Sequence, residues 1–319
     1  MNKLVIFNYK NNNKQLSFSN FKKTDVKKRF MNCLKNNELD NSLYWGVELD
    51  LSGEQEYIWN QILYFYCDYV NIYNSSFILY YFKRYESFIH YSKNIYKEKY
   101  DYRNSLKMRN HLCELISTIV CSNYKTIQKL PKISNNDFDF NNHILLCKEI
   151  NEINNIILIN DPKDIIVPCN EILYILSNNH NSSDYKKKCL FWINWLFTWD
   201  KQFNNNLVFR KIDNIDSKYY HNIHWIIWEI IFYSIKKKRN KNLNNKIQCY
   251  FYFFKHNYKK QIQKNKLIVC AIMLILENNK YNDMTFFQNY DKILKSNMNI
   301  NYIYNLVYQN KLKYENKIN

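Results

Sequence analysis

The sequence is almost free of glycine and proline, with two glycines and three prolines in 319 residues. A loop that wraps a phosphate needs several glycines, because glycine lets the backbone approach the ligand closely. The Walker A motif, the dinucleotide fingerprint G-x-G-x-x-G, the nucleophile elbow G-x-S-x-G and the zinc-protease motif H-E-x-x-H are all absent. These absences exclude P-loop nucleotide hydrolases and Rossmann dehydrogenases.

The nine cysteines are scattered singly, without a C-x-x-C pair. Disulfide frameworks and zinc knuckles use cysteines at characteristic spacings, so neither is indicated. An odd number of cysteines, most of them beside apolar residues, and an N-terminus without a signal-like segment are typical of a protein in a reducing compartment. We therefore expect the thiols to be small core residues, and we expect no cofactor.

Long hydrophobic runs are also missing. The longest run, Leu267 to Leu276, has ten residues and is closed by Glu277, about half the length that a membrane-spanning helix needs. We predict a buried core helix here and no membrane span. Hydrophobic residues make up 46% of the chain and aromatic residues 18%, which is enough to bury a large core.

Arginine is scarce, since six of the 46 basic residues are arginine and the rest are lysine. Bidentate recognition of phosphates and base edges usually relies on arginine. The composition therefore argues against sequence-specific reading of nucleic acid. Part of the formal net charge of +18 reflects a sequence rich in Asn, Lys, Ile and Tyr, as an AT-rich genome encodes.

Apolar residues at helical spacing dominate from Ser52 onward, and the same spacing places the clustered tryptophans of residues 192–199 and 225–228 in the core. The pattern predicts an all-α (mainly α) array of helices. A small β-hairpin or mobile arm is predicted at the N-terminus, from Leu4–Tyr9 and Leu16–Ser19. Helices of the C-terminal half are predicted near 168–178, 184–203, 217–235, 245–258, 264–277, 282–296 and 299–314.

All three prolines fall between residues 131 and 168, together with an Asn- and Asp-rich stretch. Such clustering indicates an irregular connection between two helical parts. The predicted parts are a basic arm or hairpin over residues 1–30, an N-terminal helical part over 31–125, the connection over 126–165 and a C-terminal helical part over 166–319.

Charges are segregated along the chain. Residues 36–82 contain seven acids and no Lys or Arg, whereas residues 230–276 contain eleven basic residues and no acid. Codon bias would scatter lysine among the acids, so the segregation is a signal in its own right. We predict a basic face that binds nucleic acid through its phosphates, or else an acidic protein. The predicted nucleic-acid-binding residues are Lys236, Lys237, Lys238, Arg239, Lys241, Lys246, Lys255, Lys259 and Lys260.

The aromatic run Tyr250–Phe254 in this block has two interpretations. Exposed rings would stack on unpaired bases. Alternatively, the lysines belong to a solvated loop beside a core helix in which the rings are buried. Two further basic groups, Lys186–Lys188 and the N-terminal group of Lys22, Lys23, Lys27, Lys28 and Arg29, either enlarge the face or are unrelated to it.

Both glycines lie within eight residues of each other in the acidic block. Because glycine is otherwise absent, at least one should have positive φ or lie against a backbone too close for a Cβ atom. Ser52 and Gln55 match an S-x-x-Q capping box for a helix that begins near Gly53. We expect the two nearby tryptophans to be buried. The predicted structural keystone comprises Trp45, Gly46, Ser52, Gly53 and Trp59.

Glu48, Asp50, Glu54 and Glu56 also permit a metal-site interpretation, in which carboxylates gather around Mg²⁺. The first turn of a helix favours negative charge, however, which explains the last two without a metal. We prefer the structural interpretation and assign no catalytic residue and no metal ligand. His221 and His224 lack a third ligand nearby and are a weak zinc signal.

The stretch from Ser42 to Gly53, followed by Trp59, resembles the pattern S-x-Y-W-x-x-E-L-x-x-S-G…W of a protein family of nucleocytoplasmic large DNA viruses (giant viruses). Three later stretches are similar to the same family, and the resemblance covers residues 42 to about 230 in order. It implies no catalytic residue. The three stretches are Asp161–Ile172, Phe191–Trp195, and Asp216–Lys218 with Trp225–Glu229.

From these features we expect a non-enzymatic viral protein that binds nucleic acid or an acidic partner and supports replication, transcription or packaging. The alternatives are an assembly protein that uses charge-segregated contacts, and a metal-dependent enzyme at Glu48 and Asp50. The resemblance implies the host cytoplasm, within viral factories, or the virion.

Overall fold

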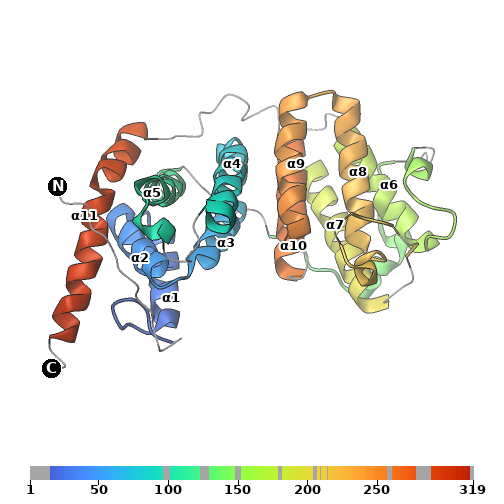
Figure 1. Ribbon diagram of the computed structural model, residues 1–319. Coiled ribbons are helices and arrows are strands. Elements are labelled where there is room, and N and C mark those ends of the chain that lie inside the picture. The colour runs from blue at the N-terminus through green and yellow to red at the C-terminus, as the bar shows by residue number, and fades with distance from the viewer. Residues whose placement is uncertain are drawn as a thin grey trace. The chain divides into compact units, whose positions relative to one another are not determined.

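The computed structural model describes residues 15–95, 101–122, 129–147, 152–178, 182–203, 207–208, 210–213, 215–256, 261–277 and 289–316. These residues form eleven α-helices joined by short 3-10 and π turns (Figure 1). Within the described ranges the only extended pairing is an isolated bridge between Leu16 and Lys22. The all-α prediction is confirmed. Of the predicted hairpin, Leu4–Tyr9 lies outside the described residues, and Leu16–Ser19 forms no strand beyond this bridge.

The helices group into two units. Unit 1 contains residues 1–126 and 283–319, and unit 2 contains residues 127–282. The sequence-based division differs at the C-terminal end, because it assigned everything after residue 166 to one part. The last helix, α11, packs on α2 and α5 of unit 1. Among the described helices, none combines the length and the apolarity needed to cross a membrane.

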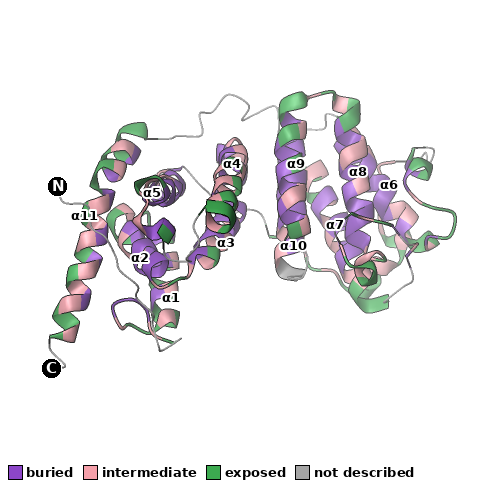
Figure 2. Cartoon of the chain, in the orientation of Figure 1, coloured by how far each residue is buried: buried purple, intermediate pink, exposed green. Residues whose placement is uncertain are grey.

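Unit 1 is built around α2, a helix that is buried on most of its sides. Every residue from Gly46 to Leu51 in its C-terminal half is buried, including the acids Glu48 and Asp50, so this part of the helix lies in the core (Figure 2). It packs against α1, α5 and α11. The bounds in unit 1 are α1 Lys23–Lys35, α2 Leu39–Leu51, α3 Gln55–Phe65, α4 Phe77–His90, α5 Leu106–Val120 and α11 Tyr290–Glu315.

Short turns extend the helices of unit 1. They are a π turn and a 3-10 turn after α3, a π turn after α4 and a 3-10 turn before α5. These turns redirect the chain without glycine, which the sequence lacks there. Their bounds are Tyr66–Val70, Asn71–Asn74, Tyr91–Ile95 and Asp101–Asn104.

Unit 2 packs α6, α7, α8 and α10 around a core that holds five tryptophans. Trp192, Trp195, Trp199, Trp225 and Trp228 are all buried, as the helical spacing predicted. The bounds in unit 2 are α6 Ile166–Ser177, α7 Ser183–Phe203, α8 Ile223–Lys238, α9 Lys241–His256 and α10 Gln261–Glu277, with 3-10 turns at Asn135–Phe138, Phe140–Asn142, Ile153–Asn155, Lys163–Ile165 and Ser217–Tyr219.

The end of the chain departs from the predicted helices. The predicted helices 282–296 and 299–314 are continuous within α11 wherever the structure describes them. The Asn-rich stretch around Met298 suggested a break, but asparagine lowers helix propensity by less than about 1 kcal/mol per residue. Burial of Ser296 and Ile300 on either side of the stretch outweighs this cost.

An ion pair organises the irregular segments of unit 2. The Arg210 guanidinium donates from both terminal nitrogens to the Asp161 carboxylate, at 2.7 and 3.2 Å. The same carboxylate accepts the backbone N–H groups of Leu158 and Val208. Both ionic side chains are buried. The pair therefore fastens two segments that lack regular structure to each other.

His224 supplies a pH-dependent element in the core of unit 2. Its ring stacks on Phe197 and contacts the amide oxygens of Asn222 and Asn265. Burial, reinforced by the nearby charge of Lys264, lowers the pKa of His224 to about 3. The folded ring is therefore neutral at pH values where an exposed histidine takes up a proton.

We expect unit 2 to lose stability as the pH falls below about 6.5. The unfolded chain binds a proton at His224 that the folded chain cannot, so the free energy of unfolding rises with pH in this window and drops on acidification. Urea unfolding between pH 7 and about 4.5, above the range where most carboxylates titrate, measures this slope. His224→Phe should flatten it, and an unchanged slope would contradict this role.

Candidate nucleic-acid interface

The basic residues from Lys236 to Lys241 lie at the turn between α8 and α9, two antiparallel helices that lie side by side (Figure 1). Arg239 follows α8 in the left-handed conformation, with φ 50°. Glycine normally occupies this position, but here an arginine does. The Asn240 side chain then accepts the N–H of Leu243 at 3.0 Å, which caps the start of α9.

Four basic side chains are exposed at this turn, namely those of Lys236, Lys237, Arg239 and Lys241. Lys238 is half-buried, and burial lowers its pKa. Lys237 pairs with Glu152. The lysines also stabilise the C-terminus of α8, where the helix dipole is negative, so part of this pattern has a structural explanation.

The start of α7 brings Lys186–Lys188 to the same end of unit 2. The Lys186 ammonium pairs with Glu277, the last residue of α10. Only four residues separate α9 from α10, so these two packed helices are antiparallel, and α10 ends beside the α8–α9 turn. We call this surface the basic end; it comprises Lys186, Lys187, Lys188, Lys236, Lys237, Lys238, Arg239 and Lys241.

Acidic side chains at the basic end are few. Glu277 binds Lys186, Glu152 binds Lys237, and the exposed Asp184 lies 3.9 Å from Lys187. Lys188 donates to the backbone carbonyl of Ile144 at 3.0 Å. The described part of this surface therefore keeps an excess of positive charge. The sequence alone did not determine whether Lys186–Lys188 belong to the basic face.

Two of the remaining predicted binding residues, Lys246 and Lys255, do not join this surface. Lys246 is buried, and burial lowers its pKa. Lys255 is half-buried, with its ammonium 5.1 Å from the Phe251 ring centre. Lys259 and Lys260 lie outside the described residues. The prediction followed charge alone, whereas Lys246 occupies the inward face of α9, three residues after the buried Leu243.

The aromatic run belongs mainly to the core. Tyr250, Phe253 and Phe254 are buried, which agrees with the core interpretation of the run. Phe251 is half-buried and packs edge-on against Trp228, and Tyr252 stacks on a histidine of its own helix. The structure gives no support to base stacking on this run.

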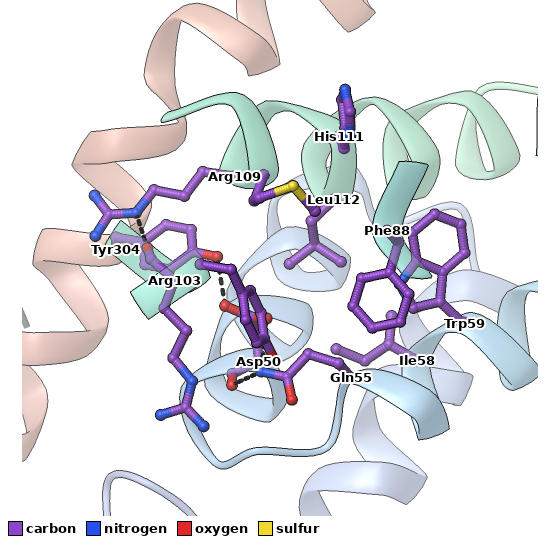
Figure 3. Close-up of a pocket in the computed structure, with 12 residues that line it drawn as sticks. Asp50, Gln55, Ile58, Trp59, Phe88, Arg103, Arg109, His111, Leu112 and Tyr304 are labelled. Carbon is purple, nitrogen blue, oxygen red and sulfur yellow. Dashed lines mark hydrogen bonds between the residues drawn. The ribbon is translucent and has the colours of Figure 1, made fainter. Parts of the chain in front are cut away.

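Unit 1 places two of the four candidate carboxylates, those of Glu48 and Asp50, in its interior, whereas Glu54 is half-buried and Glu56 is exposed. Glu48 accepts hydrogen bonds from the backbone N–H and the hydroxyl of Ser19, each at 2.7 Å. Asp50 accepts from Tyr304 at 2.7 Å and from Gln55 at 3.0 Å (Figure 3). The two carboxylates thus have separate sets of donors. Among the described residues, no three His, Cys, Asp or Glu side chains are placed to hold a metal ion.

A cavity of about 20 Å³ lies beside Asp50, which is room for one water molecule. Burial raises the pKa of the Asp50 carboxyl, against the opposing effect of Arg103. The Arg109 guanidinium lies 4.3 Å from the Tyr304 ring centre. His111 also borders the cavity, but its ring points away from Asp50 (Figure 3). These contacts connect α2, α5 and α11. They do not place a general acid beside a general base, as acid–base catalysis would require.

The prediction that at least one of the two glycines has positive φ is confirmed by Gly53. Gly53 has φ +82°, and a Cβ atom at Gly46 would lie 2.4 Å from Cδ1 of Ile116. Trp59 is buried as predicted, whereas Trp45 is half-buried, with the Arg29 guanidinium 5.1 Å from its ring centre. Gly46 therefore lets α2 approach α5, and Gly53 turns the chain between α2 and α3.

The predicted capping box at Ser52 and Gln55 is wrong. Ser52 ends α2: its hydroxyl donates to the Glu48 carbonyl and accepts the N–H of Phe18. Gln55 donates to Asp50 instead of bonding back to Ser52. The motif fitted because Ser52 stands three residues before Gln55, but Gly53 turns the chain before α3 begins, so Ser52 lies outside the cap position.

We expect Gly53→Ala to lower the free energy of unfolding by about 1 to 2 kcal/mol, because a side chain at this φ strains the backbone. A Cβ atom would also meet the Arg103 guanidinium at 3.2 Å. The matched control is Asn37→Gly, since Asn37 also has positive φ and glycine accepts it without strain. Urea unfolding measures both. Equal stability of Gly53→Ala and the wild type would contradict the assignment.

Sequence reasoning missed the residues that surround Asp50. Arg103, Arg109 and Tyr304 lie 53 or more positions away along the chain, and no local spacing connects them to Asp50. The charge count indicates only that such partners exist, because a buried carboxylate in an acidic block needs basic or hydrogen-bonding partners from elsewhere in the chain.

In the comparisons with known proteins, no protein-family model, no curated protein and no solved structure matches this chain.

Proposed function

We propose that this chain is a helical protein that binds nucleic acid through the basic end of unit 2 and has no catalytic activity of its own. The observation that carries the proposal is the group of exposed basic side chains at the α8–α9 turn, Lys236, Lys237, Arg239 and Lys241. They stand beside Lys186–Lys188 from the start of α7. Few acids offset them.

The basic end suits the phosphate backbone better than the bases. Lysine ammonium groups neutralise phosphates and release condensed counterions, which gives affinity without sequence preference. Arg239 is the only arginine there, so bidentate contacts to bases are few. The neighbouring aromatic rings are mainly buried. Binding should therefore depend strongly on salt and weakly on sequence.

The biological role that we propose is support of replication, transcription or packaging in a large DNA virus. It rests on the resemblance of residues 42 to about 230 to a family of such viruses. The corresponding location is the host cytoplasm, within viral factories, or the virion. The small cavity beside Asp50 is too small for a substrate, which favours a binding role over the metal-dependent enzyme.

The charge-segregated assembly hypothesis has less support, because it needs an exposed acidic surface. Glu48 and Asp50 are buried, and Glu54 pairs with Lys23 and Lys27 at 3.2 and 2.6 Å. Three of the seven acids of the block are therefore engaged within unit 1, while Asp40 and Glu56 are exposed. An acidic protein from outside the chain remains the alternative occupant of the basic end.

Fluorescence anisotropy with labelled duplex DNA, single-stranded DNA and RNA of several sequences tests the proposal. We expect binding that varies little among sequences and weakens as salt rises. Polyglutamate serves as the comparison polyanion. Tighter binding of polyglutamate than of any nucleic acid would favour the acidic protein partner, and no binding of any polyanion at low salt would refute the proposal.

A further inference from the structure

The long helix α11 carries an apolar stripe on the face that points away from the core of unit 1. Met298, Tyr302 and Leu306 are 80%, 63% and 39% exposed. They follow one another at intervals of four residues, so they lie on one side of the helix. The opposite side is buried against α2 and α5. A stripe of this kind is more indicative of a docking surface than isolated apolar residues are.

Charged and polar residues continue the same face in both directions. Lys295 and Asp291 precede the stripe, and Gln309 and Lys313 follow it, all four at helical spacing and exposed. The face is therefore centred on Tyr302. Its charges are distributed unequally about this centre, with an acid at one end and a base at the other.

We propose that this face binds a second copy of the chain as an antiparallel helix pair. With Tyr302 at the two-fold axis, Met298 packs against Leu306 of the second copy and Lys295 lies opposite Gln309. Asp291 then lies opposite Lys313 at each end of the pair. The face is complementary to itself in shape and in charge, as a two-fold interface requires.

The parallel arrangement is disfavoured by the same charges. In a parallel pair each residue faces its own copy, so Asp291 would oppose Asp291, Lys295 would oppose Lys295 and Lys313 would oppose Lys313. Like charges across a helix pair destabilise it and select against that orientation. Charge complementarity therefore chooses the antiparallel pair.

The contact extends from Asp291 to Lys313, about 33 Å of helix at 1.5 Å per residue. A single helix pair of this length is smaller than a standard stable interface. The dimer should accordingly be weak and reversible. Each dimer would carry two basic ends, which raises its avidity for a long polyanion when both can reach it.

Sedimentation velocity of the full chain over a range of concentrations tests the proposal. We expect the average mass to rise from monomer towards dimer with concentration. Tyr302→Glu combined with Leu306→Glu should hold the chain at the monomer mass, with unchanged circular dichroism because both side chains are exposed. Leu106→Glu, at a 47% exposed position of α5, is the matched control and should leave the dimer intact.

A charge swap tests the orientation. Asp291→Lys and Lys313→Asp should each weaken the dimer, because each places like charges opposite one another, and the double variant should restore it. A wild-type chain that stays monomeric at every concentration overturns the proposal and leaves the stripe to another occupant. A dimer that survives the glutamate variant, or a double variant as weak as the single ones, overturns it too.

Discussion

Asp161→Ala should lower the free energy of unfolding of unit 2 by about 3 to 5 kcal/mol, because it leaves the buried Arg210 guanidinium without its main counter-charge. Glu229 also contacts Arg210, at 3.1 Å, but its side chain is 43% exposed. The backbone N–H groups of Leu158 and Val208 would lose their acceptor as well. The two irregular segments would then separate more easily from the helices.

Tryptophan fluorescence during urea unfolding measures this effect, since five of the seven tryptophans lie in unit 2. The matched control is Asp184→Ala, whose carboxylate is exposed and 3.9 Å from Lys187; its loss should cost less than about 1 kcal/mol. Asp161→Leu combined with Arg210→Met should recover much of the stability, because paired apolar replacement removes both charges. A loss at Asp161 no larger than at Asp184 would contradict the structural role.

The same ion pair has a defined pH dependence. Burial would raise the pKa of Asp161, but hydrogen bonds from Arg210 and from two backbone N–H groups outweigh burial and lower it. A carboxyl whose pKa is lowered by folding contributes stability above its unfolded pKa of about 4, and this contribution disappears as the pH falls through the folded value. The difference in the free energy of unfolding between the wild type and Asp161→Ala should therefore disappear only in strong acid.

Charge reversal at the basic end should produce the largest functional effect. Lys236→Glu, Lys237→Glu, Arg239→Glu and Lys241→Glu in one chain should weaken nucleic-acid binding roughly a thousandfold or more at low salt, since each cation near an anionic surface is worth on the order of 1 kcal/mol. All four side chains are exposed, so the fold should be retained. Anisotropy titration and circular dichroism measure the two properties.

The matched control changes the net charge equally at another place. Lys22, Lys28, Arg29 and Lys35 are exposed on or beside α1 of unit 1, and their replacement by glutamate should weaken binding far less. Equal loss in the two variants would show that the total charge, and not the basic end, determines affinity.

The helices were predictable because apolar periodicity identifies a buried face without knowledge of its partner. Apolar periodicity does not identify the partner of that face, and for this reason the place of the last helix was not predicted. The spacing of Ile300, Tyr304 and Val307 predicts an amphipathic helix, but not that it packs in unit 1. Such a pairing depends on contacts between residues far apart in the sequence, as between Tyr304 and Asp50.

The candidate interface was predictable only in part, because the charge pattern does not show which lysine side chains face solvent. The run of basic residues from Lys236 to Lys241 lies at a helix junction, where charge is solvated, and four of its five basic side chains are exposed. Lys246 belongs to the same charge block, but its position on α9 points it inward. Charge patterning gave the location, and helical phase decided which lysines reach the surface. Lys186–Lys188 joined them through tertiary packing, which no local pattern encodes.

The salt dependence of nucleic-acid affinity tests the basic end most directly. Lys236, Lys237, Arg239 and Lys241 are each replaced by glutamine, and the affinity for duplex DNA is measured across a series of salt concentrations. If these four residues contact phosphates, the slope of log affinity against log salt should be smaller by about three to four in the variant than in the wild type. Parallel slopes would contradict the account.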